Sequence, residues 1–197
     1  MRITSTKINA HWNYLLSVEA DLARLARFIE FDERNYQCFS VENARILIAA
    51  AAEVDAVCKQ LCQKLNPSSS ADSINKYRNE IVQALPVFPR FEVLAPRYGL
   101  RLKPWDNWNN PSGAPDWWTA YNKIKHHRDT EYHRASLKNV LNAVAGLFVS
   151  CLYLYKDQAK LGELVPSPSI LRPTEDRLGG FYHGGYEIGI AYNFEDG

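Results

Sequence analysis

The sequence predicts a mainly α-helical fold, in which an antiparallel bundle of three to four helices carries a small accessory made of a β-hairpin and a strand. Three observations lead to this prediction. Apolar residues recur at helical spacing in residues 11–30, 41–65 and 117–157. Short connections between such helices favour antiparallel neighbours. Proline, glycine and short alternating runs gather instead in residues 86–116 and after residue 160, where the sequence favours strands and loops.

The first two helices are predicted from apolar stripes on one face. Within residues 11–30 the stripe consists of Leu15, Val18, Leu22, Leu25, Ala26 and Ile29. Ser40 is a suitable N-cap for the second helix, residues 41–65, whose stripe includes Leu47, Cys58 and Cys62. These two cysteines are four residues apart on one face and could supply two metal ligands, but we interpret them as small core residues.

The remaining elements follow in order. Residues 73–84 form a short helix, and Phe91–Leu94 with Gly99–Lys103 form a hairpin inside an irregular insert at about 86–116. Residues 117–157 are predicted to be one long helix. We therefore expect a helical domain over residues 1–160, followed by a segment over residues 161–197 whose linker and single C-terminal strand pack on the same domain.

The bulk composition narrows the classes of protein. The net charge is only +1 over 197 residues, so any attraction for an anion must come from a local patch. The four cysteines are too sparse for a disulfide framework. The N-terminus lacks an apolar signal-peptide core, and the apolar run Ala143–Tyr155 is shorter than the roughly 20 residues of a membrane span. We expect a cytoplasmic protein with no membrane partner, no cofactor and no bound metal.

A polar stripe is predicted on the last helix. At about 100° per residue, the core face that carries Val144 and Leu147 continues toward the N-terminus through Asn122, His126, Asp129 and His133. Tyr121, Lys125, Arg128 and Tyr132 form the adjoining stripe. Polar groups on a buried face need partners or a wet cleft. The stripe is therefore either a satisfied hydrogen-bond network that fixes the helix register or the lining of a cleft or dimer groove.

Asp55 lies within the apolar stripe of the second helix, between Ala51 and Cys58. A buried carboxylate needs a cation or several hydrogen-bond donors. The segment rich in His, Lys and Arg at residues 123–138 is the obvious source of both. We therefore predict that Asp55 contacts this segment as a structural partner, where it could also orient a histidine.

Phosphate is the natural ligand of the segment between Lys123 and Lys138, which holds five Lys and Arg against Asp129 and Glu131. Arginine binds phosphate in a bidentate manner, and histidine donates or accepts protons near neutral pH. Trp117 and Trp118 lie just upstream and could stack on bases. The alternative for the tryptophans, which we favour, is packing in the core and the loops.

A helical bundle whose last helix carries an Arg-x4-His motif resembles the HEPN superfamily. The match here is Arg128-Asp129-Thr130-Glu131-Tyr132-His133, and the bundle pattern covers about residues 11–157. The resemblance implies metal-independent RNA cleavage by a homodimer, with a role in defence or as a toxin. It implies that His133 is the acid/base and Arg128 stabilises the charge on the phosphate, while Asp129 orients one of the two.

Asn122, Lys125 and His126 are added to this site as phosphate-binding residues because they lie on the polar stripe and its neighbour. The resemblance also covers HEPN-like proteins that have no catalytic activity. The alternative function is therefore a non-catalytic, dimeric interaction or regulatory module, in which the polar stripe forms the dimer interface. A metal-dependent hydrolase is a third hypothesis, because Asn122, His126, Asp129 and His133 share one face. No His-Glu-x-x-His pattern supports it.

Overall fold

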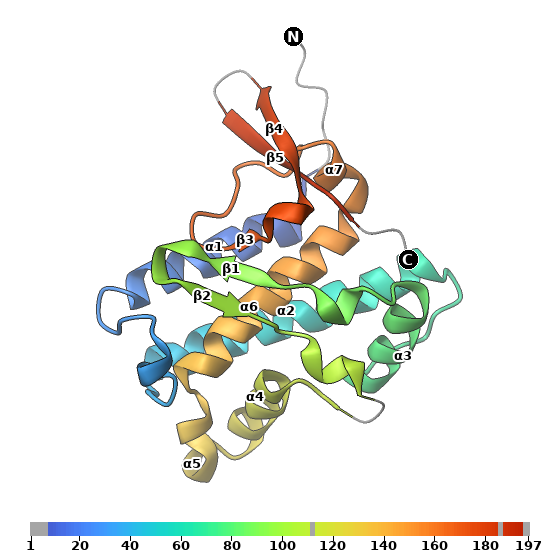
Figure 1. Ribbon diagram of the computed structural model, residues 1–197. Coiled ribbons are helices and arrows are strands. Elements are labelled where there is room, and N and C mark those ends of the chain that lie inside the picture. The colour runs from blue at the N-terminus through green and yellow to red at the C-terminus, as the bar shows by residue number, and fades with distance from the viewer. Residues whose placement is uncertain (1–7, 111–112, 185–186, 195–197) are drawn as a thin grey trace.

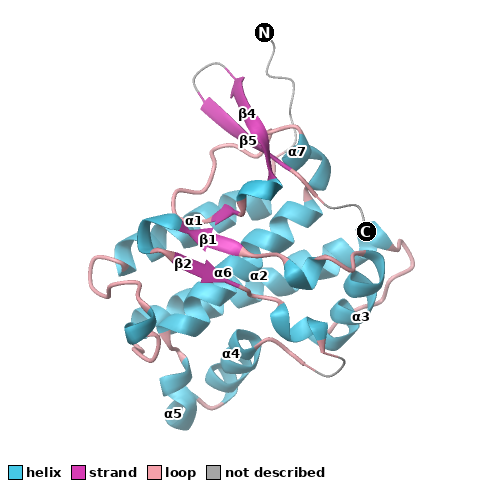
Figure 2. Ribbon diagram, viewed as in Figure 1, coloured by secondary structure: helices cyan, strands magenta, loops and turns pink. Residues whose placement is uncertain are grey.

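The computed structural model describes residues 8–110, 113–184 and 187–194. These residues are mainly helical, with two small antiparallel sheets (Figures 1 and 2). The elements in chain order are α1 (Ala10–Leu25), α2 (Val41–Leu65), α3 (Ile74–Ala84), β1 (Val93–Ala95), β2 (Leu100–Leu102), α4 (Asp116–His126), α5 (Arg128–Glu131), α6 (Leu137–Leu154), α7 (Lys156–Lys160), β3 (Arg172–Pro173), β4 (Leu178–Gly184) and β5 (Glu187–Tyr192).

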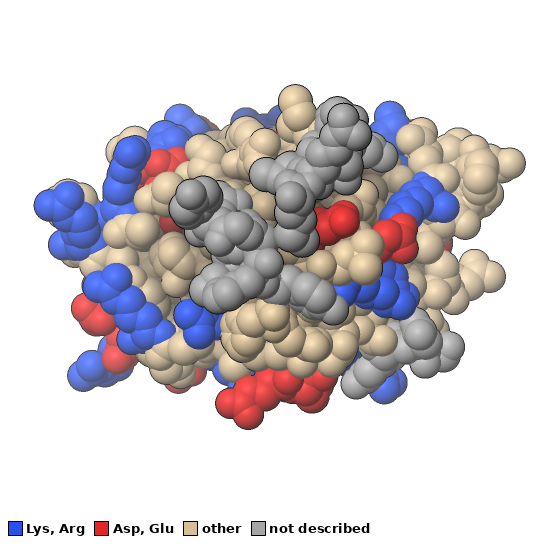
Figure 3. Space-filling model, turned by 90° about the horizontal axis from the view of Figure 1, so that it is seen from above, with Lys and Arg blue, Asp and Glu red and all other residues tan. Residues whose placement is uncertain are grey.

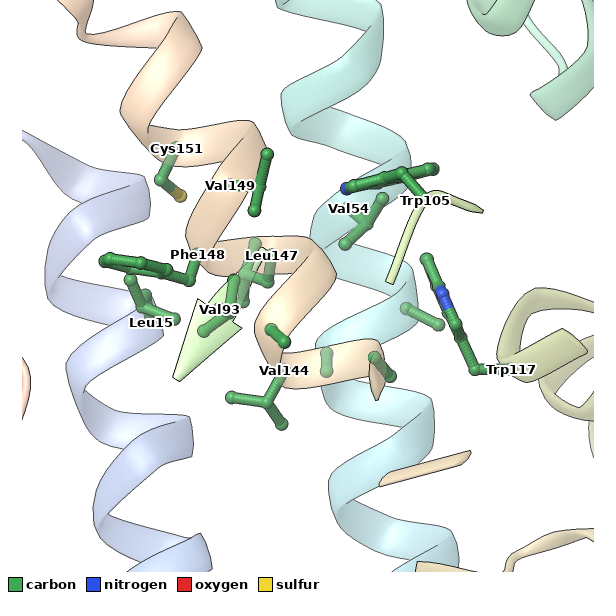
Figure 4. Close-up of a cluster of buried hydrophobic side chains, with 14 of the residues drawn as sticks. Leu15, Val54, Val93, Trp105, Trp117, Val144, Leu147, Phe148, Val149 and Cys151 are labelled. Carbon is green, nitrogen blue, oxygen red and sulfur yellow. The ribbon is translucent and has the colours of Figure 1, made fainter. Parts of the chain in front are cut away.

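The core is built around α6, which packs along α2 and also contacts α1 and α4. Figure 4 shows Val144, Leu147 and Phe148 of α6 among buried side chains that other elements supply, including Leu15 of α1 and Val54 of α2. Burying one such apolar side chain contributes about 1.5–3 kcal/mol to folding. The high apolar content of α6 is therefore explained by its place between the other helices.

Helix α6 is also long and apolar enough to cross a membrane by length and composition alone. However, 83% of its most apolar window is buried inside the protein. Packing in the core of the protein therefore accounts for the apolar character of α6. The described residues contain no other helix that passes the same test.

The second predicted helix is confirmed over its full length. Ser40 is its N-cap and accepts a hydrogen bond from the backbone N–H of Asn43 at 3.1 Å. Cys58 and Cys62 are fully buried, which confirms their interpretation as small core residues. The first helix is shorter than predicted, because α1 ends at Leu25 and residues 26–28 form a turn.

The predicted hairpin is confirmed by β1 and β2, which pair antiparallel with Val93 opposite Leu102. Gly99 makes the connection, because its φ of +64° lies in the left-handed region that glycine adopts without strain. The third strand of this sheet is β3, which pairs with the other edge of β1 and places Pro173 opposite Val93. The sheet therefore takes its third strand from the segment predicted to be a linker.

The prediction of one C-terminal strand is wrong. The tail forms a hairpin of β4 and β5, which pair with each other and form a sheet separate from β1–β3. This hairpin projects beyond the helices at the top of Figure 1. Its lower end packs on the helical core, where the ring centroids of Tyr192 and Phe148 are 6.2 Å apart.

The prediction of one continuous helix over residues 117–157 is also wrong. α4 ends at His126, and His127 leaves the helical conformation at φ −139° and ψ 48°. After the single turn of α5 and a 3-10 turn, Ser136 caps α6 and accepts a hydrogen bond from the backbone N–H of Asn139. Between His127 and Arg134 only Tyr132 is apolar, so no apolar stripe holds this stretch against the core.

Candidate basic site at the end of helix α4

The break at His127 divides the predicted site between three local structures. Asn122, Lys125 and His126 lie on the second half of α4. Trp117 and Trp118 lie at the start of the same helix. Arg128 and Asp129 belong to the short α5, and His133 lies in the 3-10 turn that follows. The prediction that Asn122, His126, Asp129 and His133 line one face of a straight helix is therefore wrong.

The segment that precedes α2 holds the stretch between α4 and α6 in place through backbone and ring contacts. The backbone N–H of Leu137 donates to the carbonyl of Cys38 at 2.8 Å, and a β-bridge joins Phe39 to Ser136. The rings of Phe39 and Tyr132 meet edge to face, with centroids 6.0 Å apart. The segment that precedes α2 thus satisfies free N–H groups at the start of α6 and fixes the polar stretch beside it.

Trp117 and Trp118 are buried, with exposed fractions of 2% and 7%. The indole N–H of Trp117 donates to the carbonyl of Pro104 at 2.8 Å, and its ring lies edge to face with Trp105 at 5.2 Å. A Cβ atom on Gly146 of α6 would approach this ring to 3.0 Å, so glycine lets the indole lie close to α6. The burial of Trp117 contradicts the hypothesis that it stacks on bases and confirms the packing interpretation for this residue, whereas Trp118 also lines a hollow described below.

The cations and imidazoles that follow are exposed instead. We call residues Lys123–Arg134 the basic segment, and its exposed members are Lys123, Lys125, His126, His127, Arg128, Asp129, Thr130 and His133. Within the part of the chain that the structure describes, Arg128 and His133 form neither an ion pair nor a side-chain hydrogen bond. Arg134, by contrast, pairs with Glu131. Arg128 and His133, two of the three residues predicted to be catalytic, are therefore accessible to a ligand, and the third, Asp129, is also exposed.

Positively charged side chains of the basic segment lower the pKa of Glu131. The hydrogen bond from Arg134 lowers this pKa, and the positive charges of Arg134, Lys123 and His133 contribute to the same shift. Lys123 and His133 are thus near enough to a common carboxylate to act on it, although they lie on either side of the break.

Figure 3 shows a face of the molecule that is turned away from α4 and α5. On this face the basic side chains (blue) and the acidic side chains (red) are interspersed.

A hollow of about 360 Å³ lies beside the last two turns of α4. Its lining residues come from α4, from the first turn of α3 and from the loop before α4, and the polar ones are Asn75, Thr119, Asn122, Lys123, His126 and His127. Among the predicted site residues, Trp118, Asn122 and His126 line this hollow, whereas Lys125, Arg128, Asp129 and His133 do not.

Asp55 does not serve as a partner of the basic segment. It lies half-buried on α2 and forms a hydrogen bond with the hydroxyl of Tyr77 on α3. Burial, followed by the charge of Asp55 and this hydrogen bond, raises the pKa of Tyr77 well above its ordinary value. The carboxylate thus finds a donor on a neighbouring helix rather than a cation, and the predicted contact is wrong.

Sequence reasoning missed a second polar cluster, between α1 and α2. Nδ1 of His11 lies 2.5 Å from Oε1 of Glu53, and its Nε2 lies 2.8 Å from the amide nitrogen of Gln60. The backbone N–H of His11 also donates to the hydroxyl of Tyr155. The signal in the sequence was the spacing of Glu53 and Gln60, which lie seven residues apart on one face of α2. Both ring nitrogens are engaged, so this cluster joins two helices.

The metal hypotheses find no support in the described residues. No group of three or more His, Cys, Asp or Glu side chains among them could hold a metal ion. Burial raises the pKa of Cys62 to about 12 and that of Cys58 further, so both thiols stay protonated. Their complete burial agrees with the interpretation as small core residues.

Comparison of the chain with protein-family models, with curated proteins and with solved structures found no match. The resemblance to the HEPN superfamily therefore stays a prediction.

Proposed function

We propose that the protein binds RNA through the basic segment and cleaves it without a metal, as a HEPN-like ribonuclease that acts as a homodimer. The observation that carries the proposal is the exposure of Arg128 and His133, neither of which has an ion pair or side-chain hydrogen bond within the described residues. Exposed side chains without a protein partner are available to bind and protonate a substrate. Five Lys and Arg between Lys123 and Lys138 supply the charge that a phosphate backbone requires.

The role of each residue follows from its chemistry. His133 is the acid/base that handles the ribose 2′-OH or the leaving oxygen, because one nitrogen of an imidazole can accept a proton and the other can donate one. Arg128 stabilises the negative charge that develops on the phosphate. On one straight helix these residues would be separated by about 140° of rotation. In the structure, Arg128 begins the short α5 and His133 lies in the 3-10 turn that follows, so the two residues do not belong to one straight helix.

We also infer that α1, α2, α4 and α6 correspond to the three or four helices of the HEPN-like bundle. Their pairwise packing supports this inference, since α6 contacts the three others. In this assignment, the basic segment follows α4 and leads into the last helix of the bundle. We propose a cytoplasmic location, which agrees with the burial of α6 inside the protein.

The alternative is a non-catalytic, dimeric interaction module, and one observation favours it. Phe28, Phe39 and Val41 are exposed to 82%, 51% and 76%, near the junction of α1 and α2. Phe39 also touches Tyr132 of the basic segment. Exposed apolar side chains beside a charged segment are typical of protein interfaces.

Cleavage of RNA in the presence of EDTA separates the two functions. The wild-type protein is expected to degrade a single-stranded RNA, and His133→Ala is expected to lower the rate by at least about 100-fold, in line with the loss of a general acid/base. Arg90→Ala, which removes an exposed arginine far from the segment in sequence, is the matched control. RNA that stays intact with every variant, from a protein that is a stable dimer, favours the interaction module.

A further inference from the structure

The polar side of the hollow beside α4 is formed by groups that donate hydrogen bonds or carry positive charge. Lys123, His126 and His127 line it at the end of α4, and Asn122 lies one turn before His126. Among the described residues that line the hollow there is no Asp or Glu. A hydrogen-bond acceptor with negative charge therefore suits this part of the lining best.

Another part of the lining is apolar. Ile74 of α3, Ala114 of the preceding loop and Trp118 of α4 form this part of the lining. Trp118 is held by edge-to-face contacts with Trp117 and Tyr121, at centroid distances of 5.9 and 5.5 Å. A ligand that suits this lining therefore combines an anionic group with an apolar part.

The charge on the polar side suits a terminal phosphate better than a bridging one. The ring centroids of His126 and His127 are 6.5 Å apart, and Lys123 belongs to the same lining. A phosphomonoester carries about −1.5 to −2 charge near pH 7 and has three acceptor oxygens, whereas each phosphate within a chain carries a single charge. Three cationic or imidazole donors therefore gain more from a terminal phosphate.

The first turn of α3 adds to this preference. Ile74 and Asn75 are its first two residues and both line the hollow. Ser73, which precedes them, makes no capping hydrogen bond with its side chain. The positive end of the helix dipole thus lies beside Lys123 and the imidazoles and increases the field that attracts an anion.

We propose that this hollow is a nucleotide subsite, which binds a terminal phosphomonoester on Lys123, His126 and His127 and places the base against Trp118. The inference rests on the proposed RNA binding for the identity of the molecule that carries the phosphate. The subsite adds a preference for RNA with a phosphorylated end. Cleavage by Arg128 and His133 does not depend on this preference.

Fluorescence anisotropy with three RNA oligonucleotides of one sequence tests the proposal. They carry a 5′-phosphate, a 3′-phosphate or hydroxyls at both ends, and the His133→Ala protein is used so that they stay intact. At least one phosphorylated RNA is expected to bind about 10-fold more tightly than the hydroxyl form. His126→Ala and Lys123→Ala are expected to abolish that difference, whereas Arg128→Ala weakens all three RNAs alike. Equal affinity for all three RNAs would overturn the subsite and leave the proposed function intact.

Competition distinguishes an RNA end from a free nucleotide. AMP, adenosine or inorganic phosphate is added to the complex of the protein with the 5′-phosphorylated RNA. AMP is expected to displace the RNA at lower concentrations than adenosine or phosphate. If no RNA binds, calorimetry of AMP alone decides between the two proposals. Binding of AMP that His126→Ala abolishes keeps the subsite and rejects the RNA function, whereas absence of AMP binding rejects both. Circular dichroism of each variant confirms that it is folded.

Discussion

The carboxylate of Glu19 on α1 accepts two hydrogen bonds from Ser169, one from its backbone N–H at 2.7 Å and one from its hydroxyl at 3.2 Å. The backbone N–H groups of Ile170 and Leu171 donate to the other oxygen at 2.8 and 2.9 Å. Glu19 is only 3% exposed. A single buried carboxylate therefore fixes the chain that leads into β3, and the indole of Trp12 adds a hydrogen bond to the carbonyl of Pro166.

Glu19→Ala is expected to destabilise the protein by about 3 kcal/mol, because it leaves three backbone N–H groups of the 169–171 segment without their acceptor. Chemical denaturation measures this change. Glu19→Gln keeps the shape but loses the charge, so its effect should be smaller. Glu30→Gln, at an exposed position after α1, is the control and should leave the midpoint unchanged. A loss below about 1 kcal/mol for Glu19→Ala would show that water replaces the carboxylate.

Trp117→Ala is expected to lower the free energy of unfolding by about 3–5 kcal/mol, since it leaves a large cavity between Trp105 and α6. Thermal denaturation checks this value. Where the variant is still folded, its affinity for RNA with hydroxyl ends should equal that of the wild type, because the indole of Trp117 is buried. A folded variant with normal stability and weakened RNA binding would restore Trp117 to the binding surface.

The elements that the sequence predicts well are those whose apolar spacing is long and local. Helix α2 was predicted with its N-cap Ser40, because both the stripe and the cap lie within one continuous segment. The hairpin of β1 and β2 was predicted for the same reason, since Gly99 and its flanking strands are adjacent. The mainly helical character of the fold follows from these local patterns.

The break after α4 was missed, because the polar positions Asn122, His126, Asp129 and His133 keep a helical period through it, although no apolar stripe accompanies them between His127 and Arg134. A distant segment, which could not be assigned from the sequence, fixes the start of α6, since the backbone carbonyl of Cys38 accepts a hydrogen bond from the N–H of Leu137. The partner of Asp55 was missed on similar grounds, because the nearest suitable donor, Tyr77, comes from another helix. Sequence reasoning thus identified the exposed cations of the site but not their arrangement.

The four cysteines are expected to differ sharply in reactivity. Cys38 is exposed, whereas Cys58, Cys62 and Cys151 are buried and burial raises the pKa of each of the three thiols. A thiol reagent at pH 8 should therefore modify one thiol per native chain, and four after denaturation. The native Cys38→Ser variant should show no modified thiol. Rapid reaction of a second thiol would contradict the packing of α2 against α6.

The pKa of Glu131 is expected to lie below its ordinary value, chiefly because of the hydrogen bond from Arg134. A carboxyl group of this kind contributes stability that is complete above its unfolded pKa and is lost as the pH falls through the folded pKa. Carbon-detected NMR titration measures the value directly. Arg134→Ala should return the pKa to its ordinary range, and His133→Ala should raise it slightly, because it removes a nearby positive charge.

Lys138→Ala serves as the control for this titration, because Lys138 is exposed but is not among the groups that shift Glu131. A wild-type pKa at or above about 4.3, the ordinary value for glutamate, would show that Arg134 and Glu131 are not paired in solution.

The salt dependence of RNA affinity tests the central claim of the account, that the exposed cations of the basic segment bind the phosphate backbone. The affinity of wild-type protein for single-stranded RNA should fall steeply as salt rises, and the double variant Lys125→Ala/Arg128→Ala should reduce the slope of log affinity against log salt by about 1.4, or about 0.7 for each lost phosphate contact. The control Arg27→Ala/Arg90→Ala, which removes two exposed arginines from other parts of the chain, should keep the wild-type slope. Equal slopes for the two double variants, or no measurable binding by the wild type, would contradict the account.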